Sequence, residues 1–84
     1  MELSDYRARI DQIDLQLVEL FAQRMNTAAG IAAYKKEHGL PVLDPVRERE
    51  KLLDVAAQAP EDMRDYTASL YTMLFELSRC YQGR

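Results

Sequence analysis

The sequence predicts an all-α protein in which each chain forms three helices and two chains intertwine as a homodimer. Apolar residues recur at alternating steps of three and four through most of the 84 residues, which is the spacing of helices that pack on other helices. Proline occurs only at residues 41, 45 and 60, so two breaks divide the chain into one long, one short and one medium helix. We expect residues 1–84 to form a single helical domain.

The first helix is predicted to begin near Ser4 and to run for about 33 residues. Ser4 is a suitable N-cap, with an acidic residue in the first turn. Gly39 follows two lysines and a histidine and occupies the position expected for a helix stop. One apolar stripe follows the helix: Leu3, Tyr6, Ile10, Ile13, Leu17, Leu20, Ile31 and Tyr34.

The other two helices are delimited by their caps. Asp44 followed by Pro45 is a strong helix start, and we expect this second helix to end at Ala57 or Gln58. Residues 59–62 predict a break and a restart. The third helix carries an apolar face made of Met63, Tyr66, Leu70, Leu74, Leu77 and Tyr81.

The length of the first helix predicts the dimer. A helix of about 33 residues is roughly 50 Å long, and the second helix, less than half that length, cannot cover it. A chain this small also buries only about 60–65% of its unfolded surface. A second copy of the long helix is the simplest cover for the exposed stripe, so an antiparallel, intertwined helical bundle follows.

Composition narrows the class of partner and the compartment. The net charge of −3 argues against nucleic acid, and no apolar run approaches the length of a membrane span. The first residues lack the basic and apolar segments of a signal peptide. Cys80 is the single cysteine, which fits a reducing compartment. We therefore expect a cytoplasmic protein that binds neither a membrane nor nucleic acid.

Arg24 stands where the apolar stripe calls for a leucine. Its helical neighbours three and four positions away include no acid, and the same is true of Lys35. Lys35 lies within about 20° of Arg24 around the helix and roughly 16 Å along it. Two such cations could hold a small, multiply charged anion. Alternatively, Arg24 pairs with an acid from another helix, and Lys35 merely stabilises the helix C-terminus.

Further polar residues could face the same space. Arg47 and Glu48 lie in the first turn of the second helix, where both also have ordinary structural roles. Ser78 and Gln82 share one face of the third helix. Arg7 is roughly 25 Å from Arg24 along the same helix, so it could reach such a site only on a partner chain.

Together these residues resemble the all-helical class of chorismate mutases. The likeness is carried by residues 7–14, 44–49 and 78–82, and it covers almost the entire chain. The nine positions in register are Arg7, Asp14, Arg24, Lys35, Asp44, Arg47, Glu48, Ser78 and Gln82. The resemblance implies an intertwined dimer with two equivalent sites, each completed by one arginine of the other subunit, here Arg7.

The implied reaction is the [3,3] rearrangement of chorismate to prephenate in phenylalanine and tyrosine biosynthesis, which requires no cofactor and no metal. By resemblance, Arg7, Arg24 and Ser78 would hold the two carboxylates. Lys35 and Gln82 would donate to the ether oxygen, which gains negative charge as its bond breaks. Glu48, with the backbone at Asp44, would accept from the ring hydroxyl. Arg47 would hold Glu48 or the loop in place, and Asp14 would serve helix packing and polar pairing.

Two alternatives remain at this point. An isochorismate–pyruvate lyase would use the same fold and a nearly identical site, and Lys35, Glu48 and Gln82 do not decide between the two activities. A non-catalytic helical dimerisation or regulatory module would require an acid partner for Arg24 and would have no affinity for a small dianion.

Overall fold

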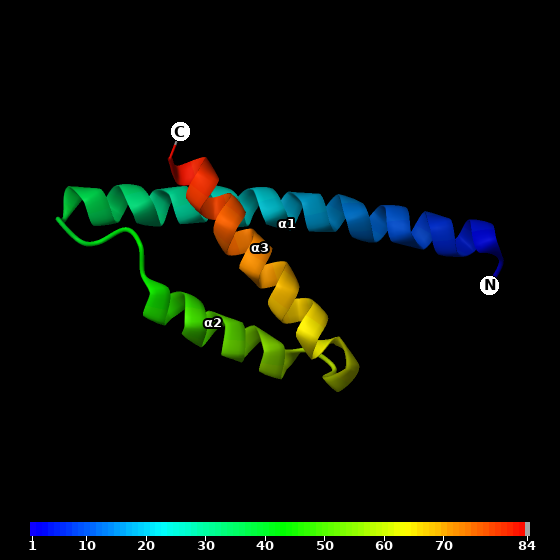
Figure 1. Cartoon of the computed structure of the whole chain (residues 1–84). Helices are drawn as coiled ribbons and strands as arrows, with labels where there is room; N and C mark the ends of the chain where they lie inside the picture. Colours follow the sequence, from blue (N-terminus) through cyan, green and yellow to red (C-terminus); the bar gives the residue numbers. More distant parts are fainter. Residues whose placement is uncertain (84) are drawn as a thin grey trace.

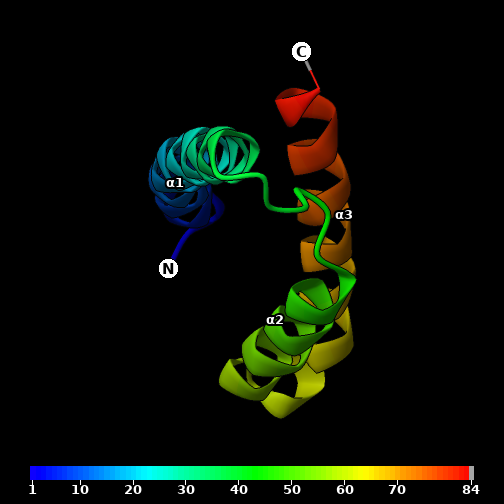
Figure 2. The ribbon, with the colours of Figure 1, turned by 90° about the vertical axis from the view of Figure 1, so that its left-hand side faces the viewer.

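The computed structural model describes residues 1–83 and is all-α, as predicted. The helices are α1 (Leu3–Glu37), α2 (Pro45–Gln58) and α3 (Arg64–Gln82), with a single 3-10 turn, η1 (Glu61–Met63), directly before α3. Figure 1 shows α1 as a long rod whose C-terminal half is crossed by α3, while α2 lies beside α3. The end-on view in Figure 2 shows the same pairing of α2 with α3.

The start of α1 differs from the prediction. The helix begins at Leu3 with Glu2 as its N-cap, so the assignment of Ser4 as N-cap was wrong. The carboxylate Oδ2 of Asp5 accepts a hydrogen bond from the backbone N–H of Glu2 at 2.9 Å. A carboxylate three positions inside the helix thus reaches back to the cap, and a charged acceptor forms a stronger bond than a hydroxyl does.

The end of α1 is the predicted glycine stop. Gly39 has a positive φ of 66°, a conformation that residues with a side chain rarely adopt. The N–H of Leu40 donates to the carbonyl of Lys35 at 2.7 Å, and that of Gly39 donates to the carbonyl of Lys36 at 3.4 Å. This pair of bonds is a Schellman motif, and it turns the chain toward α2 next to Lys35.

The start of α2 is also confirmed. The Asp44 side chain accepts from the backbone N–H of Arg47 at 3.0 Å, and Pro45 is the first helical residue. The cap therefore fixes the first turn of α2, which carries Arg47 and Glu48. The helix ends at Gln58, within the predicted limits.

The chain by itself has a small core at the place where α3 meets the other helices. Within residues 1–83 the buried apolar side chains are Ala32, Val55 and Phe75, joined by the hydroxyl-bearing Ser78. The predicted apolar face of α3 is mostly exposed, as Tyr66 at 77% and Leu70 at 53% illustrate. Helix α3 carries apolar residues on two adjacent faces. The face that packs within the chain, with Phe75, lies next to the predicted one.

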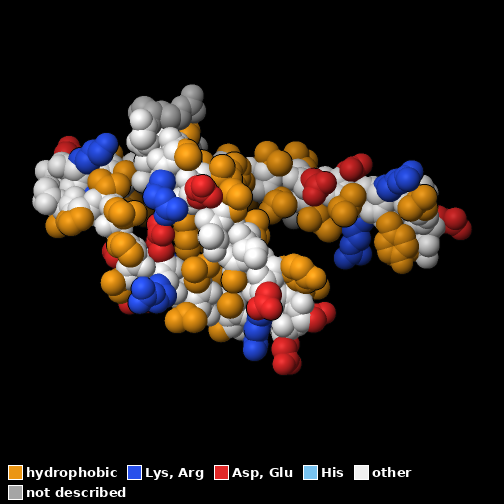
Figure 3. Space-filling model, in the orientation of Figure 1, with side chains coloured by type: hydrophobic (Ala, Val, Ile, Leu, Met, Phe, Trp, Pro, Cys, Tyr) orange, Lys and Arg blue, Asp and Glu red, His pale blue; other side chains and the backbone are white. Residues whose placement is uncertain are grey.

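The N-terminal half of α1 projects away from the other helices (Figure 1). The molecule is accordingly elongated and measures 55 × 26 × 16 Å. Apolar side chains line this projecting half in Figure 3. The exposed stripe residues there are Leu3, Tyr6, Ile10, Ile13, Leu17 and Leu20. No helix in residues 1–83 combines the length and hydropathy that a membrane crossing requires.

Candidate active site

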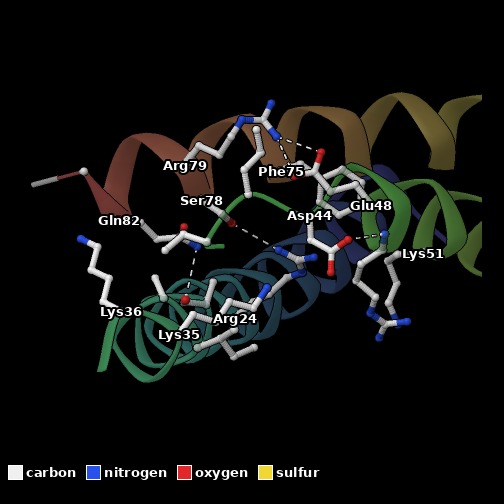
Figure 4. Close-up of a pocket in the computed structure, with 17 residues that line it drawn as sticks. Arg24, Lys35, Lys36, Asp44, Glu48, Lys51, Phe75, Ser78, Arg79 and Gln82 are labelled. Atoms are coloured by element: carbon white, nitrogen blue, oxygen red, sulfur yellow. Dashed lines mark hydrogen bonds and ion pairs between the residues drawn. The ribbon is translucent and has the colours of Figure 1, made fainter. Parts of the chain in front are cut away.

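A cavity of about 610 Å³ lies between the C-terminal half of α1, the start of α2 and the last turns of α3. Figure 4 shows side chains from all three helices projecting into it. Seven of the eight residues predicted to bind a ligand line its wall: Arg24, Lys35, Asp44, Arg47, Glu48, Ser78 and Gln82. Arg24 and Gln82, which are 58 positions apart in sequence, therefore share one space.

Arg24 is half-buried and is held by neutral groups. Its Nη1 donates to the Oγ of Ser78 at 3.3 Å. Its Cζ atom lies 5.4 Å from the ring centroid of Tyr71 and 5.6 Å from that of Phe75, within the range of cation–π attraction. No carboxylate of residues 1–83 forms an ion pair with it. The acid partner that a purely structural role for Arg24 would require is thus absent from the described part of the chain.

Ser78 is the buried polar residue of the site. Only 6% of the residue is exposed, and its hydroxyl accepts from Arg24 while it contacts the Sδ of Met25 at 3.6 Å. The hydroxyl therefore ties α3 to α1 and fixes the direction of the Arg24 guanidinium.

Lys35 and Gln82 lie at the end of the cavity that is nearer the Schellman turn. In Figure 4, Arg24 and Lys35 project from α1 while Ser78 and Gln82 project from α3 opposite them. Both Lys35 and Gln82 are half-buried. The Nε2 of Gln82 donates one hydrogen bond to the carbonyl of Ala28 at 3.3 Å, and an amide nitrogen has a second hydrogen to offer.

The partner of Glu48 is Arg79, which no sequence pattern had identified. The Nη1 of Arg79 lies 2.9 Å from Oε1 and 2.7 Å from Oε2 of Glu48. Arg47 is exposed, and its backbone N–H donates to Asp44. Its predicted role of holding Glu48 or the loop in place stays a prediction.

The cavity wall has a strong excess of positive charge. Six cationic side chains and two carboxylates line it, which leaves a difference of four positive charges in a chain whose net charge is −3. The cations are Arg24, Lys35, Lys36, Arg47, Lys51 and Arg79. A local potential of this sign attracts and retains a small ligand with several negative charges.

Arg7 is the one predicted site residue outside the cavity. It lies exposed on the projecting half of α1, 17 positions before Arg24, and so roughly 25 Å away along the helix. Asp14 lies on the same projecting half and is also exposed. Neither residue can contact the cavity of its own chain.

Comparison with known proteins places this arrangement in a family. The family described as "Chorismate mutase type II" matches residues 6–83. Similar proteins include the chorismate mutase of Methanocaldococcus jannaschii, 38% identical over 48 residues, which are 57% of this chain and 48% of that protein. The T-protein of Haemophilus influenzae is 41% identical over 46 residues, 55% of this chain and 12% of that protein.

A third relative is the 4-amino-4-deoxychorismate mutase of Streptomyces venezuelae, 37% identical over 46 residues, which are 55% of this chain and 45% of that protein. The matched segment is thus less than half the length of each of these three relatives. The family match, by contrast, extends over nearly the whole chain and includes every residue that lines the cavity. On that match, the chain belongs to the chorismate mutase type II family.

Proposed function

We propose that this chain converts chorismate to prephenate by a cofactor-free [3,3] rearrangement, as a step of phenylalanine and tyrosine biosynthesis. The observation that carries the proposal is the placement of Arg24 and Lys35 in one cavity, without a carboxylate partner in residues 1–83, opposite the neutral donor Gln82. Such a wall suits a dicarboxylate that develops further negative charge on an oxygen as it reacts.

The reaction needs no nucleophile, because the bonds form and break within one molecule. The protein has to hold the substrate in a compact chair and stabilise the charge that develops as the ether C–O bond breaks. Arg24, fixed by Ser78, binds a carboxylate. Lys35 and Gln82 donate to the ether oxygen from the two sides of the cavity.

The other end of the substrate carries a ring hydroxyl, for which we propose Glu48 as acceptor, with the backbone at Asp44. Both lie at the start of α2, which the Asp44 cap holds in place. Arg47 contributes positive charge to the same wall. No catalytic role follows for Asp14, which we assign to contacts between helices.

We further propose that two chains pair in antiparallel fashion and intertwine, so that Arg7 of each chain completes the site of the other. Two observations support this. Within residues 1–83, half of α1 has no helix beside it, although its stripe is apolar (Figure 1). Arg7 lies on that half, exposed and out of reach of its own cavity. Residues 1–84 would then act as one helical domain, and the single cysteine keeps the cytoplasm as our expected location.

An absorbance assay on the purified protein tests the activity. We expect chorismate to be consumed and prephenate to be identified as the product by chromatography. Isochorismate is assayed separately, and release of pyruvate from it would assign the chain to the sibling lyase activity instead. 4-Amino-4-deoxychorismate is the third substrate, because a relative of similar identity is named for it. A folded protein that consumes none of the three and binds no dicarboxylate would be a non-catalytic helical module.

A further inference from the structure

Arg79 on α3 pairs with Glu48 on α2 in the cavity wall, and Arg79 itself has no part in the mechanism above. One guanidinium nitrogen sits between both carboxylate oxygens, at 2.9 and 2.7 Å. The side chains are 44% and 32% exposed, so the pair is open to the cavity and to a ligand in it. Within residues 1–83, no other cation forms an ion pair with Glu48.

This contact changes what Glu48 can recognise. A carboxylate has about four acceptor positions, so one that already receives a guanidinium N–H can still accept a hydrogen bond from a hydroxyl. A ligand ammonium at the same place differs in two ways. It would have to share a carboxylate whose charge is already balanced, and it would lie close to a guanidinium of the same sign.

We propose that Arg79 is a specificity-determining residue: by pairing with Glu48, it makes the site favour a substrate with a neutral ring hydroxyl over the analogue with a ring ammonium. The inference rests on the proposed function, because only that proposal puts the ring substituent next to Glu48. Chorismate carries the hydroxyl. 4-Amino-4-deoxychorismate carries an amine, protonated at neutral pH, in its place.

A different role for Arg79 would leave a different signature. If Arg79 released Glu48 and bound a substrate carboxylate, its removal would lower kcat/KM equally for both substrates, since both carry the same two carboxylates. If the pair were only a surface contact, its removal would change neither. The ratio of the two kcat/KM values therefore distinguishes the proposed role of Arg79 from these two alternative roles.

The test measures kcat/KM for the two substrates with the wild type and three variants of the full chain. Arg79→Leu should shift the ratio toward the amino substrate by about tenfold, which corresponds to ~1.4 kcal/mol. Arg79→Lys keeps the charge and should retain most of the wild-type preference. Lys36→Met is the matched control, because Lys36 is a cation of the same wall that forms no ion pair with Glu48. Its ratio should stay within about twofold of the wild type.

A fourth variant tests the direction in which the kcat/KM ratio changes. Glu48→Gln removes the anion but leaves Arg79, so its ratio should move the opposite way, toward chorismate, whatever its loss of rate. An unchanged ratio in Arg79→Leu, with the helical circular dichroism of the wild type, would overturn the inference and leave the proposed function standing. An equal shift in Lys36→Met would also overturn it. A folded wild type that turns over neither substrate would overturn the proposed function, and the inference with it.

Discussion

The Nη1 of Arg24 on α1 lies 3.3 Å from the Oγ of Ser78 on α3, which joins a cation to a buried hydroxyl across 54 positions of sequence. The guanidinium also lies over the rings of Tyr71 and Phe75. These neutral contacts fix its direction without cancelling its charge. A cation oriented in advance can stabilise negative charge that develops in the transition state, with little rearrangement of the protein.

Replacement of Arg24 by alanine should therefore remove activity far more than stability. We expect kcat/KM for chorismate to fall by about 10²–10³-fold, the usual cost of removing one preorganised donor. Thermal unfolding should change little, because no carboxylate of residues 1–83 loses its partner. Arg24→Lys is the matched control and should be intermediate, since an ammonium cannot bind a carboxylate in the same planar way. A strongly destabilised Arg24→Ala protein with near-normal activity would favour a structural role.

Arg7 provides a test of the shared site. Arg7→Ala and Arg24→Ala chains should each lose most of their activity, but a mixture should regain activity. A heterodimer has one site that lacks both arginines and one site that has both. The measurement is chorismate turnover after subunit exchange, with each variant alone as the control. If exchange is demonstrated by mass and no activity returns, the two arginines do not belong to one site.

Gln82 gives a prediction about pH. An amide is neutral at every working pH and can always donate to the ether oxygen, so the wild-type rate should be nearly constant from about pH 5 to 8. In Gln82→Glu the new side chain donates only when protonated, and its ionised form repels the oxygen. The rate should therefore fall as pH rises, and the cation of Lys35 should move the midpoint to lower pH. Superimposable pH–rate profiles for the two proteins would rule out this role for Gln82.

The exposed stripe of α1 gives a prediction about assembly. Ile13 is 51% exposed in the single chain, and we place it at the dimer interface. Ile13→Glu should weaken dimerisation by at least about tenfold, because burying a carboxylate without a partner costs several kcal/mol. Gln12→Glu adds the same charge one residue earlier, away from the apolar stripe, and should leave the dimer intact. Sedimentation equilibrium of both variants checks this, and equal dissociation constants would place the interface elsewhere.

Local patterns were sufficient to predict the helices and the elements that shape the site. The Asp44 cap and the Gly39 stop each depend on a few neighbouring residues, and both form as expected. The start of α1 was predicted two residues late, because Asp5 reaches back to Glu2 and the Ser4 hydroxyl is not used as the cap. Arg24 could be recognised as unusual because its position in the apolar stripe is itself a local property.

The Arg79–Glu48 pair could not be predicted in the same way. Its members are 31 positions apart and meet only because α3 packs beside α2 at one particular rotation. Adjacent residues in a helix, such as Arg47 and Glu48, point about 100° apart, so adjacency could not indicate which cation Glu48 contacts. The same limit applies to α3, where the periodicity revealed an apolar face but could not tell which of two adjacent faces packs within the chain.

The small core has a thermodynamic consequence. Ala32, Val55 and Phe75 are the buried apolar side chains of residues 1–83, and the backbone entropy lost on ordering a helix such as α1, of 35 residues, is about 1–2 kcal/mol per residue. Most of the compensation has to come from apolar surface that one chain leaves uncovered. Under the proposed dimer, folding is therefore a second-order process, and the melting temperature rises with protein concentration. The amount of this protein that a cell makes would then set the fraction that is folded, and with it the activity per unit amount of protein.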